Sequence, residues 1–294
     1  MDILHEESSF QQENPGVSEE EQDSEEKEGL VAEISEECSE EGGVAEVGYE
    51  LQNTQQGGQT RAIFVHQLPR KGLSFQLWPA ATALCWYLDH TYGNSGMQVA
   101  SSSYAIRGVG GKEGEEVSGV KRRRLRVLEL GAGTGMVGVL AARLGAHVTL
   151  TDLAHVLPNL EQNVELNKLT VEAGGGSLSV HLLQWGVKED VAALGQEPFD
   201  LILASDVVYY DTLFEPLVKT LKWLVGASPV VLLAHLRRWK KDKHFFRMAC
   251  KFFHLEVVHQ HPPPENYRTG VVVYRLTRHE YDKLGRASCC SNGW

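Results

Sequence analysis

Four glycines between two apolar segments have the spacing of a ligand site. An apolar run over residues 125–130 leads directly into the glycines, which lie within residues 131–138, and a second β-branched run ends at Asp152. This order predicts a strand, a glycine-rich turn, a helix and a second strand that ends in an acid, as in nucleotide-binding sites. Glycines let the backbone turn sharply and approach a ligand closely. Asp152 could then accept hydrogen bonds from both hydroxyls of a ribose.

Two classes of cofactor fit this arrangement, and one acidic residue distinguishes them. Gly133–Gly138 satisfies the dinucleotide pattern GxGxxG, although that match is weak by itself. A dinucleotide places its pyrophosphate against the helix N-terminus, where the carboxylate of Glu129, just before Gly131, would be electrostatically unfavourable. S-adenosylmethionine has no phosphate and carries a sulfonium and an ammonium group, so an acid is tolerated or useful there. The residues favour S-adenosylmethionine, with a nicotinamide cofactor as the alternative.

A second segment, FDLILASDVVYY, could place an acid and a phenol beside this site. A buried strand over residues 199–205 is followed at once by Asp206 and Tyr209. We expect both side chains to face one space from the first turn of a helix, at the edge of the sheet where ligands bind. Methyl transfer to an amine needs a neutral nitrogen, which a carboxylate and a phenol can orient while they stabilise its growing positive charge. The same pattern also fits a helix-capping Asp with a packing Tyr.

Hydrophobic patterning predicts the elements that position these groups. Residues 47–66 predict a hairpin, and residues 77–90 predict a helix with Leu84, Tyr87 and Leu88 on its buried side. Strands are expected near residues 125–130, 147–152, 178–184, 199–205, 229–235, 254–260 and 270–277, and helices near 135–144, 156–168, 211–225 and 240–252. This alternation predicts an α/β fold, doubly wound, with a mostly parallel seven-stranded sheet. A short proline-rich loop makes the final hairpin antiparallel.

Charge is distributed unevenly along the 294 residues. The formal net charge is −11, yet residues 1–50 contain 18 of the 39 acids and one of the 28 Lys and Arg. We expect residues 1–46 to be a disordered acidic tail, because they have little apolar surface to bury. Residues 47–278 should form one domain with a surface loop at 91–120, and residues 279–294 a flexible C-terminal extension.

Other features bear on compartment and partners. The five cysteines lack metal-ligand spacing, which favours reduced thiols and predicts no metal. Without a signal segment or a long apolar run, we expect a cytoplasmic monomer that does not enter the membrane, with a nuclear location also compatible. The basic and aromatic segment 235–246, HLRRWKKDKHFF, is typical of nucleic-acid binding. We favour instead a solvated helix start that meets an acidic protein partner.

Several segments together resemble one family. They are Trp78-Pro79-Ala80-Ala81, Leu128–Gly135, Thr151-Asp152, Gln184-Trp185-Gly186 and Asp206-Val-Val-Tyr209. With these segments the chain resembles class I, seven-β-strand S-adenosylmethionine-dependent methyltransferases, in particular the lysine methyltransferases of methyltransferase family 16. Within that family it is similar to the valosin-containing-protein and heat-shock-chaperone lysine methyltransferases. The fold implied is Rossmann-like, with a reversed final hairpin.

The resemblance implies a protein-lysine N-methyltransferase that acts on a folded protein, with a chaperone or an AAA ATPase as the expected substrate. It implies that Asp206 and Tyr209 are catalytic. The expected contacts to S-adenosylmethionine are Trp78, Glu129, Gly131, Ala132, Gly133, Asp152, Trp185 and Ala204. Glu129 is included because it is the acid that precedes the glycine loop. The alternative is a methyltransferase of nucleic acid or of a small molecule. Enzymes that methylate base nitrogens usually have two prolines where this chain has Val207 and Val208.

Overall fold

The computed structural model describes most of the region predicted to be a domain. The described residues are 34–35, 45–50, 62–100, 122–225, 229–263 and 268–279. They all belong to one compact unit, Ala32–Trp294, and the other unit, Met1–Val31, lies outside them. Most of the predicted tail, the centre of the predicted loop and the predicted C-terminal extension also lie outside the described residues.

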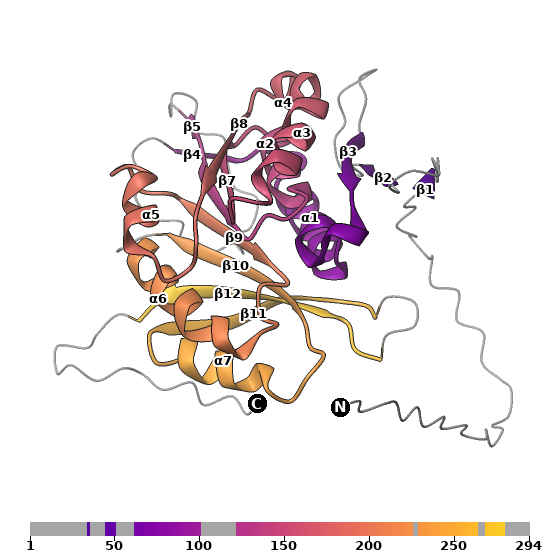
Figure 1. The fold of residues 1–294 in the computed structure, drawn as a ribbon. Coiled ribbons are helices and arrows are strands. Elements are labelled where there is room, and N and C mark those ends of the chain that lie inside the picture. The colour runs from indigo at the N-terminus through magenta and orange to yellow at the C-terminus, as the bar shows by residue number, and fades with distance from the viewer. Residues whose placement is uncertain are drawn as a thin grey trace, which may run out of the picture. The chain divides into compact units, whose positions relative to one another are not determined.

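A seven-stranded sheet in the order β11-β12-β10-β9-β6-β7-β8 positions the other elements (Figure 1). Its strands are β6 (Arg126–Leu130), β7 (His147–Asp152), β8 (Ser177–Leu182), β9 (Leu201–Ser205), β10 (Val230–Leu236), β11 (Phe253–His261) and β12 (Val271–Arg278). The strands from β10 to β8 are parallel, and β12 runs antiparallel to both β10 and β11. The predicted fold class is therefore confirmed, including the antiparallel final hairpin.

Helices cover both faces of this sheet. They are α1 (Pro79–Tyr92), α2 (Met136–Arg143), α3 (Leu157–Leu166), α4 (Lys168–Gly174), α5 (Lys188–Ala193), α6 (Phe214–Leu224) and α7 (Asp242–Ala249), with 3-10 turns η1 (Pro69–Lys71), η2 (Leu73–Phe75) and η3 (Asp211–Leu213). Helix α1 packs against α2, and α6 packs against α5 and α7, so two groups of helices lie on opposite sides in Figure 1. Every residue of β10 is buried, as expected for a parallel strand covered on both faces.

The local predictions hold for most elements and fail at three. The predicted helix 156–168 is two helices that meet at Asn167, and α5 was not predicted. The predicted loop 91–120 begins too early, because α1 continues to Tyr92 and β4 (Gln98–Ala100) pairs with β5 (Arg122–Arg124). Residues 101–121 lie outside the described part. Among the described residues no helix has both the length and the apolar composition of a membrane span.

The predicted hairpin is present and is attached to the domain by asparagines. β2 (Ala45–Glu50) pairs antiparallel with β3 (Ala62–Gln67), and β1 (Ile34–Ser35) pairs with β2, so short strands fall within the predicted tail. The buried side chains of Asn163 and Asn167 accept hydrogen bonds from backbone N–H groups of β3 at 2.8 and 2.9 Å. Asn163 also donates to the carbonyl of Thr134 at 2.9 Å. The hairpin is thereby joined to the glycine-rich loop.

Candidate active site

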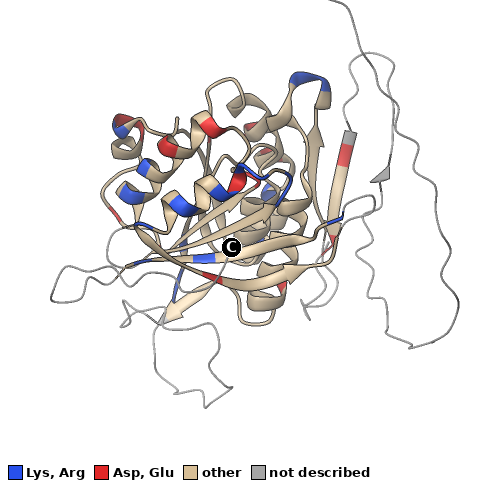
Figure 2. Cartoon of the chain, turned by 90° about the horizontal axis from the view of Figure 1, so that it is seen from below, with Lys and Arg blue, Asp and Glu red and all other residues tan. Residues whose placement is uncertain are grey.

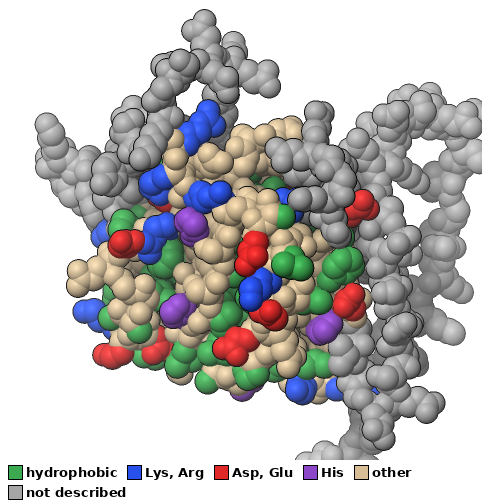
Figure 3. Space-filling model, turned by 90° about the horizontal axis from the view of Figure 1, so that it is seen from above, with side chains coloured by type: hydrophobic (Ala, Val, Ile, Leu, Met, Phe, Trp, Pro, Cys, Tyr) green, Lys and Arg blue, Asp and Glu red, His purple; other side chains and the backbone are tan. Residues whose placement is uncertain are grey.

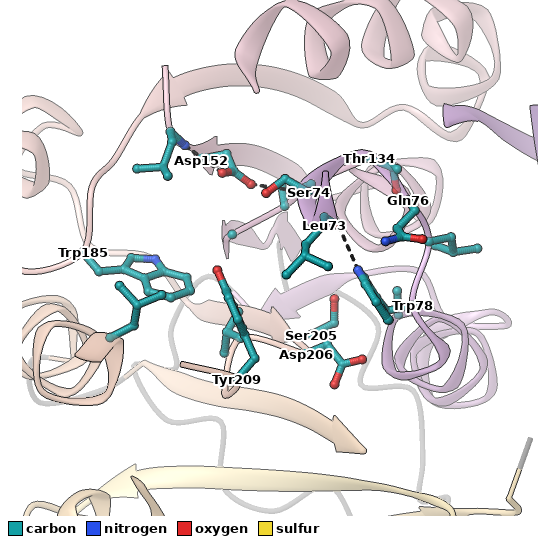
Figure 4. Close-up of a pocket in the computed structure, with 18 of the residues that line it drawn as sticks. Leu73, Ser74, Gln76, Trp78, Thr134, Asp152, Trp185, Ser205, Asp206 and Tyr209 are labelled. Atoms are coloured by element: carbon teal, nitrogen blue, oxygen red, sulfur yellow. Dashed lines mark hydrogen bonds between the residues drawn. The ribbon is translucent and has the colours of Figure 1, made fainter. Parts of the chain in front are cut away.

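A cavity of about 510 Å³ opens where β6, β7, β8 and β9 end (Figure 4). This volume lies in the usual range for small-molecule sites. The segments that follow these four strands line the cavity. Residues of η2 and of the start of α1 form another part of its wall. The lining residues include Leu73, Ser74, Gln76, Leu77, Trp78, Gly131, Ala132, Gly133, Thr134, Asp152, Leu153, Gln184, Trp185, Ser205, Asp206, Val207 and Tyr209. The position is the carboxyl edge of the sheet, where α/β proteins bind ligands.

Glycine is required in the loop because its walls are close. Gly131 and Gly133 have φ values of +61° and +57°, a region that side chains disfavour. A Cβ on Gly131 would lie 2.9 Å from the Trp185 ring, and one on Gly133 would lie 3.0 Å from the Ser74 carbonyl oxygen. The loop backbone therefore forms part of the cavity wall directly.

Asp152 lies at the end of β7 with its carboxylate in the cavity. Its Oδ2 accepts a hydrogen bond from the Gly133 N–H at 2.8 Å, and its Oδ1 accepts one from the Leu153 N–H at 2.7 Å. Burial raises the pKa of Asp152, and these two hydrogen bonds act in the opposite direction. Each carboxylate oxygen keeps a second lone pair. The group can therefore accept hydrogen bonds from two neighbouring hydroxyls of a ligand.

Two tryptophans predicted as cofactor contacts lie on different sides of the cavity (Figure 4). Trp185 follows β8 and packs against the glycine loop. The indole N–H of Trp78 donates to the Leu73 carbonyl at 2.9 Å, and the guanidinium of Arg238 lies 5.2 Å from the centroid of its ring. Both rings offer flat apolar surfaces to a ligand between them.

Two other predicted contacts, Glu129 and Ala204, do not line the cavity. Both are buried within central strands. The Glu129 carboxylate points instead toward α2, where it accepts a hydrogen bond from the N–H of Gly138 at 2.8 Å. Burial raises the pKa of Glu129 to about 8. Glu129 therefore holds the first turn of α2 against the sheet and touches no part of the cavity surface.

The conformation around Asp206 differs from the predicted helical turn. Asp206 follows β9 with φ +55°, and residues 206–210 are not helical because Val207 and Val208 turn into the core. Both carboxylate oxygens of Asp206 accept hydrogen bonds from Arg238, at 2.9 and 2.8 Å. The geometry is bidentate and the carboxylate is nearly buried, which makes this a strong charge-assisted pair.

Tyr209 extends into the cavity. Its hydroxyl points toward the Asp152 side, whereas the Asp206 carboxylate points the other way (Figure 4). Burial and then the charge of Asp152 raise the pKa of Tyr209 above its ordinary value of 10.0. The phenol is therefore protonated at neutral pH.

The sequence did not predict the wall formed by Arg238 and Trp239. Both follow β10 and line the cavity. Their backbone N–H groups donate to one oxygen of the buried Asp242, each at 3.2 Å, and that oxygen lies 3.2 Å from Nε2 of His235. Burial acts to raise the pKa of Asp242, but its hydrogen bonds and His235 hold that pKa below its ordinary value. The basic and aromatic segment 235–246 is the sequence feature that could have revealed this wall. It includes the end of β10, which lies beside the end of β9.

Known proteins match this chain over most of its length. A family described as lysine methyltransferase matches residues 59–252. The chain belongs to this lysine methyltransferase family. A mouse protein named EEF1A lysine methyltransferase 3 is 30% identical over 83% of this chain and 84% of its own length. The zebrafish protein N-lysine methyltransferase METTL21A is 33% identical over 72% of this chain and 80% of its own length.

One solved structure is a TehB-like S-adenosylmethionine-dependent methyltransferase from Corynebacterium glutamicum. It has a TM-score of 0.39 at 18% identity, and the match covers 52% of this chain and 80% of that chain. The family match identifies the chain as an S-adenosylmethionine-dependent protein-lysine N-methyltransferase. The predicted alternatives, a nicotinamide enzyme and a methyltransferase of nucleic acid or small molecules, do not agree with it.

The charges of the cavity fit the methyl donor of this methyltransferase. The acids that line the cavity are Asp152 and Asp206, and its basic residue, Arg238, is already held by Asp206. Asp152 therefore gives the lining a net negative charge, which suits the sulfonium and ammonium groups of S-adenosylmethionine. A pyrophosphate would require cationic or N–H partners there and would meet this carboxylate instead.

Proposed function

We propose that this methyltransferase binds S-adenosylmethionine along the carboxyl ends of β6, β7 and β8 and methylates a lysine of a folded protein. Asp152 accepts the ribose hydroxyls, and Trp185 flanks the adenine. Gly131–Gly133 lie against the methionine part, and Trp78 covers it from the other side. The observation that carries this assignment is the Asp152 carboxylate, which lines the cavity and is fixed by two backbone N–H groups, one on each oxygen.

The target lysine must reach the cavity as a neutral amine. When bound, S-adenosylmethionine supplies an electrophilic methyl group on its sulfonium. Apolar side chains line the cavity, among them Leu73, Val207 and Leu213. Such surroundings disfavour the ammonium form and lower the pKa of an entering lysine. Because Arg238 already balances the charge of Asp206, the entrance holds no isolated carboxylate that would trap the ammonium.

Tyr209 and Asp206 act in the transfer step in this proposal. The Tyr209 hydroxyl offers an oxygen lone pair inside the cavity, where it can orient the nitrogen. Positive charge grows on that nitrogen as the methyl arrives, and Asp206 keeps the Arg238 guanidinium paired, so that no uncompensated positive charge opposes it from the same edge of the sheet. Asp206 also holds the Arg238 guanidinium beside the Trp78 ring, whose own position is fixed by its hydrogen bond to the Leu73 carbonyl.

The test compares cofactor binding with turnover in the same purified variants. Asp206→Ala should lower the rate of methylation of extract proteins by about a hundredfold or more, as for removal of one oriented electrostatic group. Its affinity for S-adenosylmethionine should stay close to that of the wild type. Tyr209→Phe should be milder, because the ring still shapes the cavity. A wild-type rate in Asp206→Ala, with an unchanged melting temperature, would overturn the assignment of the transfer site.

Substrate and cellular context follow from the same reasoning. We propose a folded protein of the chaperone or AAA ATPase class. One mouse relative is named for EEF1A, so EEF1A is the substrate to compare with this class. We further propose a cytoplasmic monomer. Light scattering and cell fractionation test this proposal, and identification of the methylated protein by mass spectrometry tests the substrate class.

A further inference from the structure

Large apolar side chains surround the opening of the cavity. Leu73, Leu153 and Trp239 line the cavity yet remain 44, 40 and 50% exposed, so they lie at its opening. Tyr210 is 53% exposed, and its ring centroid lies 4.8 Å from that of Tyr209. We call these four side chains, which come from four separate segments, the apolar rim. Exposed apolar side chains gathered around a cavity are typical of a surface that contacts another molecule.

A basic segment adjoins this rim on one side. Residues 237–247, which contain Trp239, expose the basic side chains Arg237, Lys240, Lys241, Lys243 and Arg247. None of these five forms an ion pair with an acid among the described residues. The acid of the segment, Asp242, is buried and bonded to His235 and to backbone N–H groups. The segment therefore presents positive charge to solvent.

Neighbouring elements do little to neutralise this charge. The turn η3 and helix α6 pack against α7, and their exposed acids are Asp211 and Glu215. Glu215 is paired with Lys219 at 2.8 Å. Seen from below, Lys and Arg are prominent on the helices that lie lowest in Figure 1, whereas the face seen from above mixes both signs (Figures 2 and 3).

The position of these cations is unfavourable for the fold itself. Lys240, Lys241 and Lys243 flank the N-terminus of α7, where the helix dipole is positive and acidic residues are preferred. Mutual repulsion adds to this cost.

We propose that the basic segment docks an acidic stretch of the substrate protein beside the target lysine, while the apolar rim contacts apolar surface around that lysine. This inference rests on the proposed function. Charge complementarity selects an acidic partner, and the shared residue Trp239 joins the docking surface to the cavity. The aliphatic members of the rim, Leu73 and Leu153, favour a protein surface over the stacked bases of a nucleic acid.

The test uses two fluorescein-labelled peptides, each with one lysine, followed either by a run of glutamates or by the same run of glutamines. The full-length protein should bind the glutamate peptide about tenfold more tightly in fluorescence anisotropy, and added salt should reduce the difference. Lys240→Glu with Lys243→Glu should remove this preference. The fold should tolerate both changes, because glutamates are favourable near the N-terminus of α7.

The matched control is Lys168→Glu with Lys251→Glu, which reverses two exposed cations outside the segment and should keep the preference. Equal binding of both peptides, or equal losses in the two double variants, would overturn the proposal. Stronger binding of single-stranded DNA of equal charge would assign the surface to nucleic acid and would also overturn it. A further variant replaces the glutamates of residues 19–28 with glutamines. A tenfold gain in its affinity for the peptide would also overturn the proposal, because it would mean that the chain's own tail occupies the surface in the wild type.

Peptide binding requires no methyl transfer, so this result is independent of the assigned transfer residues. In methylation of extract proteins, Lys240→Glu with Lys243→Glu should raise KM and leave kcat nearly unchanged. A fall in kcat alone would contradict docking. If the wild-type enzyme methylates no protein while the charge-dependent binding holds, the proposed function fails and the docking surface stands.

Discussion

The Asp152 carboxylate offers the sharpest test of the cofactor site. Asp152→Ala removes the acceptor for the Gly133 and Leu153 N–H groups and, in the proposal, for the ribose hydroxyls. Hydrogen bonds to charged groups contribute about 1.5–3 kcal/mol each, and a buried donor left without a partner costs a similar amount. A net loss of about 2–3 kcal/mol at the ligand corresponds to a Kd for S-adenosylmethionine that is roughly 30- to 150-fold higher.

Titration calorimetry measures this change directly. Glu161→Ala is the control, because it removes an exposed acid from α3 outside the cavity. It should leave the affinity unchanged. Asp152→Asn keeps the shape and one acceptor oxygen, so its affinity should fall between those of the wild type and Asp152→Ala. Melting temperatures of all three variants separate loss of binding from loss of fold. A folded Asp152→Ala protein with wild-type affinity would refute the role of Asp152.

Three further predictions concern the framework around the site. Gly138→Ala should lower the free energy of unfolding by about 1–3 kcal/mol, because its Cβ would lie 2.2 Å from the Leu150 side chain and 2.5 Å from Oε2 of Glu129; thermal melting checks this. Glu129→Gln should remove a pH dependence of stability. Burial raises the pKa of Glu129 from its ordinary 4.5 to about 8. Between these pH values the unfolded chain loses the proton and the folded chain keeps it, so the stability of the wild type falls relative to that of the variant as pH rises. Denaturation at several pH values measures this difference. Deletion of residues 1–33 should leave the melting temperature nearly unchanged, since they are rich in glutamate and poor in aromatic residues; a large drop would mean that the tail packs on the domain.

Features set by local sequence could be predicted, and features set by contacts between distant segments could not. The glycine loop and Asp152 are found from sequence because a turn of that shape requires glycine and an acid follows the next strand. The orientation of Glu129 was not predictable, because a strand buried on both faces gives no alternation to indicate where a side chain points. The pairing of Asp206 with Arg238 joins the ends of β9 and β10, residues 32 positions apart. Only the strand order reveals that these ends are neighbours.

The strands β4 and β5 illustrate the same limit. Their sequences are short and lie on either side of the long segment 101–121, so no local pattern indicates that they pair. Tyr209 was expected beside the glycine loop because it follows β9, and it lines the same cavity. The predicted helical turn was wrong because Val207 and Val208 are drawn into the core. Burial of apolar side chains therefore decided the local conformation at this point.

The most direct test of protein-lysine methylation at this cavity is to incubate the full-length enzyme with S-adenosylmethionine labelled in its methyl group and a cell extract. The labelled macromolecules are then separated, and the protein fraction is hydrolysed to amino acids. We predict that the label appears in N-methylated lysine with the wild type and is lost with Asp152→Ala. Label in nucleic acid, in small molecules or in another amino acid, or equal labelling of lysine by Asp152→Ala, would contradict the account.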